Sequence, residues 1–238
     1  MSRTDAPAPQ DYHIHTIHSD GESTPISMVR ACASAGCKEI AITDHVDQHG
    51  SFVFVPEFRK TTDLRSYIEE IGMLADRVMG ELGVAVHAGI ELCTTSHEYK
   101  AAFREHVARY CDALDIILVE GRDDAGAVNV AIMAREVLRD LGQAAMPIVI
   151  SHPDFATIVK DIDAIVRNGI GLELNESKLS PAHKNGLDAV LEEARSLGIP
   201  SPRFTLGSDA HVATEAGRLP LACQHARARG LLDRLIWL

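Results

Sequence analysis

The stretch His13-Ile14-His15, with Ser19-Asp20-Gly21 shortly after it, decides how this chain is expected to fold. Near the other end, Gly207-Ser208-Asp209-Ala210-His211 again gathers metal-ligand side chains where an apolar run stops. Alternate residues of a β-strand point to the same face, so His13 and His15 are expected to bind one ion together. The two ends of the chain are therefore expected to share one metal site.

Length and composition fit one α/β domain. The 238 residues are 46% hydrophobic, and barrels of roughly 200 to 250 residues commonly form a single domain. Residues 1–10 are rich in Pro and Ala and are expected to be a mobile segment before one domain over residues 11–238. The five cysteines form no CxxC pair, which favours a reducing, cytoplasmic setting over a disulfide framework.

The acidic charge narrows the classes of partner. A formal net charge of −11 disfavours nucleic acid, although two or three bound divalent cations would offset about half of it. No apolar run approaches the roughly 18 residues of a membrane span, and the first residues carry no apolar signal segment, so no membrane partner is expected. Association into a homo-oligomer stays open.

Short β-branched runs alternate with longer amphipathic stretches along the chain. They predict seven strands, at residues 12–15, 39–43, 84–92, 115–119, 147–151, 170–175 and 203–207. The predicted helices include 64–82, 125–141, 181–197 and one that begins at Thr24-Pro25 and stops at Gly36. Strict alternation implies parallel strands with crossover helices, as an open sheet or as a closed barrel.

The polar residues at the strand ends favour the barrel. In a barrel all carboxyl ends converge on one face, whereas an open sheet gathers only the residues beside its switch point. A mixture of imidazole and carboxylate in one pocket is typical of a multinuclear hydrolytic site. The residues concerned are His13, His15, Asp44, His45, Glu91, Glu120, His152, Asn175, Asp209 and His211.

The joint order of these motifs resembles that of the PHP (polymerase and histidinol phosphatase) family, from about residue 11 to residue 217. The matching segments are Asp11-Tyr12-His13-Ile14-His15-Thr16, Ser19-Asp20-Gly21, Ile42-Thr43-Asp44-His45, Gly89-Ile90-Glu91, Ser151-His152-Pro153, Leu172-Glu173-Leu174-Asn175 and Gly207-Ser208-Asp209-Ala210-His211. Members of the family resemble a distorted (β/α)7 barrel with up to three divalent ions, and many are phosphoesterases. The resemblance implies the same fold for this chain, with two or three zinc, manganese or iron ions.

Carried over residue by residue, the resemblance implies three groups of ligands. His13, His15, Glu91 and Asp209 would bind a first ion, Glu91 would bridge to a second that His152 also binds, and Asp20, His45 and His211 would hold a third. Asp209, His211 and His45 would be the catalytic residues.

Two positions depart from the family pattern. Where the fourth strand usually closes with a histidine for the second ion, this chain reads Leu118-Val119-Glu120-Gly121-Arg122. Either Glu120 replaces that ligand, or the second ion is weakly held, or the site works with fewer metals. After Asn175, where a glycine and a basic residue are usual, the run is Glu176-Ser177-Lys178. Arg122, Lys178 and Asn175 are the candidate substrate contacts, because anion recognition recruits guanidinium or ammonium groups.

The implied chemistry is metal-assisted hydrolysis of a small phosphate ester, a phosphomonoester such as histidinol phosphate or a phosphodiester. The missing histidine supports an alternative, a non-catalytic metal-binding or regulatory module. A nuclease is a third interpretation, which the shortage of a basic stripe with aromatics disfavours. The loop of residues 47–60 is either a lid or a dimer contact. His87, His97, His106, His183 and His225 are expected to be ordinary structural or surface groups.

Overall fold

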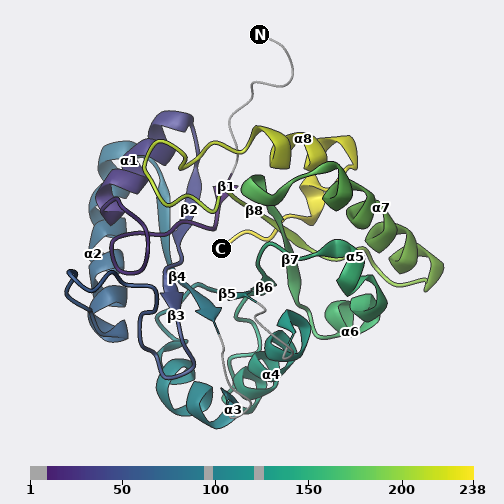
Figure 1. Cartoon of the computed structure of the whole chain (residues 1–238), viewed down its shortest axis with the longest axis horizontal. Helices are drawn as coiled ribbons and strands as arrows, with labels where there is room; N and C mark the ends of the chain where they lie inside the picture. The colour runs from purple at the N-terminus through teal and green to yellow at the C-terminus, as the bar shows by residue number, and fades with distance from the viewer. Residues whose placement is uncertain (1–9, 94–98, 121–125) are drawn as a thin grey trace.

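Parallel strands form the centre of the molecule and helices surround them (Figure 1). The computed structural model describes residues 10–93, 99–120 and 126–238, so most of the predicted N-terminal segment lies outside the described residues. The strands are β1 (Gln10–Asp11), β2 (Glu39–Ile42), β3 (His45–Val46), β4 (Ala85–Cys93), β5 (Ile116–Glu120), β6 (Ile148–Ile150), β7 (Gly171–Asn175) and β8 (Phe204–Gly207).

The strands follow one another around a nearly closed barrel, as predicted. Their order is β1-β2-β4-β5-β6-β7-β8, and every pair is parallel. The short β3 also pairs with β4. It follows β2 after a break in the regular strand at residues 43–44, so β2 and β3 together occupy the second strand position of the barrel. The predicted strand 39–43 is present as β2, which ends one residue earlier, and the separate β3 gives eight labels to seven strand positions.

The predicted first strand, 12–15, differs from the observed one. The regular ladder is β1, and residues 12–15 instead run beside the chain that follows β8. Tyr12 N donates to the Leu206 carbonyl at 2.9 Å, and a parallel bridge joins Ile14 to Ala210. These hydrogen bonds close the barrel, and they leave the segment extended but outside a regular ladder.

The helices are α1 (Pro25–Ala35), α2 (Leu64–Leu82), α3 (Tyr99–Ala102), α4 (Ala127–Asp140), α5 (Phe155–Ile158), α6 (Ile162–Arg167), α7 (Pro181–Ser196) and α8 (Pro220–Ala228). The prediction of α2 is correct at both ends, because Asp63 accepts from Ser66 N at 3.1 Å and Gly83 adopts the left-handed conformation. The sequence did not predict the short helices α3, α5, α6 and α8, since few turns carry little periodicity. Within the described ranges, no helix is both long and apolar enough to cross a membrane.

Side chains alternate between the barrel interior and the helices along each strand. Ile90 and Leu92 of β4 pack in the larger apolar core that also contains helix residues. A separate small cluster that includes Ile116, Leu118 and Val149 contributes alternate residues of the strands. Polar residues take over the inward positions toward the carboxyl ends of β4 and β7, where Glu91 and Glu173 are buried. The barrel mouth is therefore polar above an apolar floor.

His87 lies near the amino ends of the strands, away from the mouth, as expected for a structural histidine. Its Nε2 is 3.1 Å from Glu39 Oε1 and its Nδ1 is 3.6 Å from Asp115 Oδ2. Burial lowers its pKa, but Asp115 and Glu39 outweigh burial, so the pKa is raised above its ordinary value.

A raised pKa in the folded state stabilises the fold at low pH, and the contribution is lost as pH rises from 6.5 through the higher folded value. The loss of unfolding free energy in His87→Gln is therefore expected to be larger at about pH 5.5 than at about pH 8.5. Urea unfolding of both proteins at the two pH values measures it. An equal loss at the two pH values would contradict the expectation.

Candidate metal centre

The barrel mouth gathers all nine predicted metal ligands. His13 and His15 follow β1, His45 lies in β3, Glu91 in β4 and Glu120 at the end of β5, while His152 follows β6 and both Asp209 and His211 follow β8. Asp20 comes from the turn after the His-Ile-His segment. Because the strands are parallel, their carboxyl ends meet at this one face.

The first group surrounds the two histidines of the opening segment. His13 Nε2 and His15 Nε2 are 2.9 Å apart, and His15 Nε2 is 3.4 Å from Asp209 Oδ1. Glu91 Oε2 lies 3.2 Å from His13 Nε2. All four side chains are buried or nearly so. Two imidazole nitrogens therefore lie close together, with two carboxylates beside them. Ligands that share one cation are expected to have this arrangement.

The predicted third group is also assembled, with one addition. His211 Nε2 is 3.3 Å from Asp20 Oδ2, and His45 Nε2 is 3.6 Å from the same oxygen. His15 joins these three residues, since a ligand atom of each lies within 4.8 Å of those of the others. His15 therefore stands between the first group and the third.

The second group lies on the other side of Glu91. Glu91 Oε1 is 3.3 Å from His152 Nε2, whereas Oε2 faces His13 and His45, so the two oxygens point to different neighbours as bridging requires. Glu120 Oε1 is 3.9 Å from His152 Nε2, which puts the predicted replacement ligand beside this group. Cys93, which the sequence prediction missed, has its Sγ 3.1 Å from Glu120 Oε2. Its signal was the spacing of two residues from Glu91 on one strand.

The charges of the centre suit divalent cations. Burial opposes ionisation of Glu91, but His13 and neighbouring imidazoles hold its pKa well below the usual range. Burial likewise opposes ionisation of Asp209, and His13 keeps its pKa low. The pKa of His13 is raised, because Glu173, Glu91 and Asp209 overcome the effect of burial. Ionised carboxylates buried among imidazoles provide the hard and borderline donors that zinc, manganese and iron accept.

The surroundings of the Glu91 carboxylate show whether these residues fit a metal ion. Both of its oxygens are buried, and no described residue donates a well-directed hydrogen bond to them. They face imidazole nitrogens of His13, His15, His45 and His152 at 2.9 to 3.6 Å. A buried carboxylate whose neighbouring imidazole nitrogens are poorly aligned as hydrogen-bond donors is satisfied better by a cation, so the donor set fits divalent ions.

Two of the predicted ligands have strained backbones. His152 has a φ of 28° and Asp209 a φ of 59°, in the left-handed region that favours glycine. Such conformations cost of order 1–3 kcal/mol and persist at functional sites where the surroundings enforce them. In these conformations the side chain of His152 faces Glu91 and the side chain of Asp209 faces His15.

Glu173 supports the ligands from inside the barrel. One oxygen lies 2.8 Å from His13 Nδ1, and the other accepts from the backbone N of His152 at 2.6 Å and from Asn175 Nδ2 at 3.1 Å. A carboxylate on Nδ1 fixes the ring so that Nε2 faces the metal position. The prediction overlooked Glu173 as a site residue, although a charged residue inside a buried strand signalled it.

Glu173→Gln is expected to lower metal affinity about 10- to 100-fold, because an amide keeps the shape but withdraws the negative charge from His13. Titration with zinc against a competing chelator measures the affinity. Glu176→Gln is the matched control, since that carboxylate accepts from Ala222 N and Leu221 N, away from the ligands. Unchanged affinity in Glu173→Gln would show that His13 is oriented without it.

Asp44 holds the loop that carries Asp20. Its carboxylate accepts from the backbone N and hydroxyl of Thr16, each at 2.7 Å, and from the hydroxyl of Ser19 at 2.6 Å. Asp44 therefore supports the segment that carries Asp20.

The candidate substrate contacts differ in what surrounds them. Lys178 is half exposed at the rim, with Nζ 3.6 Å from Asp209 Oδ2. Asn175 caps the turn that follows β7, because its Oδ1 accepts from Lys178 N at 3.2 Å and from Ser177 Oγ at 2.8 Å. Arg122 lies outside the described residues. Contact of any of them with a substrate stays a prediction.

The loop of residues 47–60 packs against the mouth. Phe52 is buried against Tyr67, and the ring of Phe54 meets the ring of His45 edge-on at 5.0 Å between centroids. Arg59 donates to the Gly21 carbonyl beside Asp20. These contacts place the loop over the third group, whereas Phe58 is exposed.

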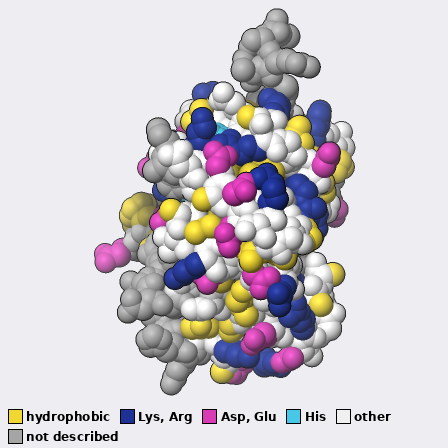
Figure 2. Space-filling model, turned by 90° about the vertical axis from the view of Figure 1, so that its right-hand side faces the viewer, with side chains coloured by type: hydrophobic (Ala, Val, Ile, Leu, Met, Phe, Trp, Pro, Cys, Tyr) yellow, Lys and Arg dark blue, Asp and Glu magenta, His cyan; other side chains and the backbone are white. Residues whose placement is uncertain are grey.

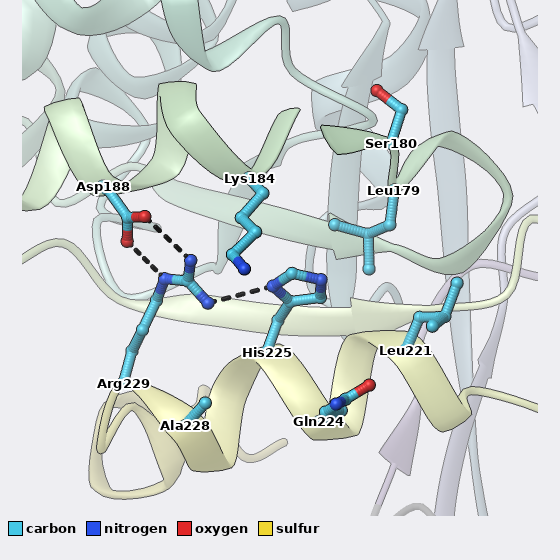
Figure 3. Close-up of a pocket in the computed structure, with 9 residues that line it drawn as sticks. All are labelled: Leu179, Ser180, Lys184, Asp188, Leu221, Gln224, His225, Ala228 and Arg229. Carbon is cyan, nitrogen blue, oxygen red and sulfur yellow. Dashed lines mark hydrogen bonds and ion pairs between the residues drawn. The ribbon is translucent and has the colours of Figure 1, made fainter. Parts of the chain in front are cut away.

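A separate cavity of about 620 Å³ lies between α7 and α8 (Figure 3). Arg229 there donates to both carboxylate oxygens of Asp188, at 2.6 and 3.0 Å, and its other terminal nitrogen lies 2.9 Å from His225 Nδ1. None of the predicted ligands is among the described residues that line it. The cavity therefore lies apart from the metal centre.

The chain forms a distorted (β/α)7 barrel, and imidazole and carboxylate side chains of the kind that bind metals form a ring at the carboxyl ends of its strands. These two features place it in the class of metal-binding barrel proteins. The family model of the PHP domain matches residues 11–177. The chain therefore belongs to the PHP domain family, as its motif order indicated.

Similar proteins agree with this assignment. A protein of Vibrio parahaemolyticus named as a probable phosphatase is 26% identical over 230 residues, which cover 93% of this chain and 85% of the relative. Another of that name, from Shewanella oneidensis, is 25% identical and covers 88% and 79%. The crystal structure of histidinol phosphate phosphatase from Lactococcus lactis, complexed with zinc, L-histidinol and phosphate, shares the fold with a TM-score of 0.63 and 20% identity. That match covers 92% of this chain and 91% of the other.

Proposed function

We propose that this chain is a metal-dependent phosphoesterase that hydrolyses the phosphate ester of a small molecule with two or three zinc, manganese or iron ions. The observation that carries the proposal is Glu91, a buried carboxylate whose two oxygens face different groups of imidazoles. A bridging carboxylate of this kind is typical of multinuclear hydrolytic centres. The names of the similar proteins, probable phosphatases, support the same reaction class.

The residues at the barrel mouth have different proposed roles. His13, His15 and Asp209 would hold one ion, His152 and Glu120 a second, and Asp20, His45 and His211 a third, with Glu91 between the first two. When bound, such ions supply an activated water and neutralise charge on the phosphoryl oxygens. Asp209, His211 and His45 are the proposed catalytic residues. The ring of His211 is 38% exposed, so it can reach an ester oxygen at the open side of the centre.

The proposed substrate is a phosphomonoester such as histidinol phosphate, or a small phosphodiester. Lys178, half exposed beside Asp209, is the proposed contact for phosphate oxygens. On the face drawn in Figure 2, Lys and Arg side chains are interspersed with Asp and Glu side chains. Mixed charge of this kind, with the net charge of −11, favours a small ester over a polynucleotide.

Turnover of p-nitrophenyl phosphate and bis-p-nitrophenyl phosphate, with added manganese or zinc, tests the proposal. We expect hydrolysis of at least one ester, its loss after treatment with a chelator, and its return when metal is restored. Metal content measured on the same sample separates the alternatives. Full metal occupancy with no turnover of either ester would contradict the enzyme and support a non-catalytic metal-binding module.

A further inference from the structure

We infer that Cys93 is a metal ligand that binds an ion through its thiolate together with Glu91 and Glu120. The inference rests on the proposed function only in taking the barrel mouth as a metal centre. It places a sulfur ligand beside Glu120, the residue at the end of β5 where the family pattern has a histidine. The chemical class of its metal is a borderline or soft divalent cation, zinc rather than manganese.

The place of Cys93 in the barrel is the first observation. Cys93 ends β4 two residues after Glu91, so both side chains lie on the inward face of that strand. The register pairs Cys93 with Glu120 on β5, which brings the thiol beside the residue that replaces the usual histidine. Ligand atoms of His45, Glu91, Cys93 and Glu120 all lie within 4.8 Å of one another.

The polar surroundings of the sulfur are the second observation. Cys93 Sγ is 3.0 Å from His45 Nδ1 and 3.1 Å from Glu120 Oε2. The other four cysteines pack within the apolar core between strands and helices, whereas Cys93, although only 1% exposed, does not belong to that core. The Cys93 thiol is buried among an imidazole and two carboxylates. These polar surroundings are typical of a metal ligand, whereas a cysteine that serves as a small apolar side chain packs against apolar groups.

Glu91 is the third observation, independent of the cysteine. Its fully buried oxygens receive no well-directed hydrogen bond from the described residues, and Oε1 points to His152 on the side of Glu120. A cation between these groups would neutralise both carboxylates.

The binding step balances as a simple exchange. The Cys93 S–H bond breaks, its proton passes to solvent, and the sulfur forms a bond to the ion with its electron pair. No oxidant or reductant is needed. Thiolate ligands favour zinc and cobalt over manganese, so this position selects the metal as well as holding it. His45 Nδ1, 3.0 Å away, is placed to donate a hydrogen bond to the sulfur when Nε2 binds on the other side.

Cobalt(II) spectroscopy tests the inference without any substrate. We expect the protein, stripped of metal and loaded with cobalt(II) chloride, to show the near-ultraviolet charge-transfer band of a thiolate–cobalt bond. Cys93→Ser should remove this band, whereas Cys111→Ser, in a buried apolar cysteine away from the mouth, should keep it. Cys93→Ser should also weaken zinc binding to one site by about 100-fold or more, beyond the effect of losing an outer partner.

X-ray absorption of the wild-type protein with zinc avoids any dependence on how the variant folds. It should show a sulfur contribution at about 2.3 Å that amounts to one sulfur per protein, averaged over all bound zinc ions. A zinc spectrum without sulfur, or a cobalt band that survives in Cys93→Ser, would overturn the inference while leaving the phosphoesterase proposal intact. A Cys93-dependent band in a protein that hydrolyses no ester would support the ligand and reject the function. Failure of wild-type protein to bind cobalt or zinc would overturn both.

Discussion

His15→Ala is expected to abolish ester hydrolysis, lowering kcat/KM by about 10³-fold or more. His15 Nε2 faces both His13 and Asp209 in the first group, and the residue also belongs to the group of Asp20, His45 and His211. Its loss removes an imidazole that is shared by two of the proposed metal positions. Bound ions supply several kcal/mol of charge stabilisation in the transition state, and each 1.4 kcal/mol is a factor of ten in rate.

The rate of p-nitrophenyl ester hydrolysis and the metal content of the same preparation measure this effect together. His106→Ala is the matched control, since the side chain of His106 is 40% exposed and its ion-pair contact is with Glu105 on the surface. The control should retain wild-type activity and metal. Wild-type turnover in His15→Ala would show that the reaction does not depend on the first and third groups.

Gly207→Ala is expected to disrupt the metal centre and the fold at once. A Cβ at Gly207 would overlap the Glu173 carboxylate and lie 2.6 Å from the Cβ of His13. The added methyl must displace the carboxylate that orients His13 or the histidine itself. Overpacking of a dense interior costs typically about 1–3 kcal/mol, so we expect that fall in unfolding free energy together with loss of bound metal.

Gly80→Ala is the control for this substitution. It lies within α2, and a Cβ there would meet nothing within 4 Å, so alanine should raise the unfolding free energy by roughly 0.5–1 kcal/mol. Urea unfolding and metal analysis of both variants provide the comparison. If Gly207→Ala keeps its metal and its stability, the packing between β8, Glu173 and His13 does not position the ligands as described.

Much of the barrel could be predicted because its signals are local. The helix α2 carries its own start at Asp63, its own stop at Gly83 and an apolar stripe between them. Strands β4 to β8 are buried runs bounded by turns, so their ranges differ from the prediction by at most one residue at either end. The first strand was misplaced, because whether residues 12–15 form a regular ladder depends on the distant chain after β8.

The same division holds within the candidate site. The spacing of His13 and His15, and the motif ending in Asp209 and His211, carry ligands in short segments that can be recognised alone. Glu173 and Cys93, by contrast, lie in segments whose sequence predicts a buried strand and does not itself indicate a role in the site. Their roles follow from the residues opposite them on neighbouring strands, His13 for the first and Glu120 for the second.

The sequence by itself determined the number of strand positions in the barrel, the barrel class, the family and the identity of nine candidate ligands, because hydrophobic period, turn chemistry and short motifs act over a few residues. Only the tertiary structure decided which ligands face which neighbours: Glu91 between two groups, His15 shared by two, and Cys93 beside Glu120. The physical reason is that strand register and barrel closure bring residues from distant segments within a few ångströms. Those distances, which no single segment encodes, decide where a cation can be held.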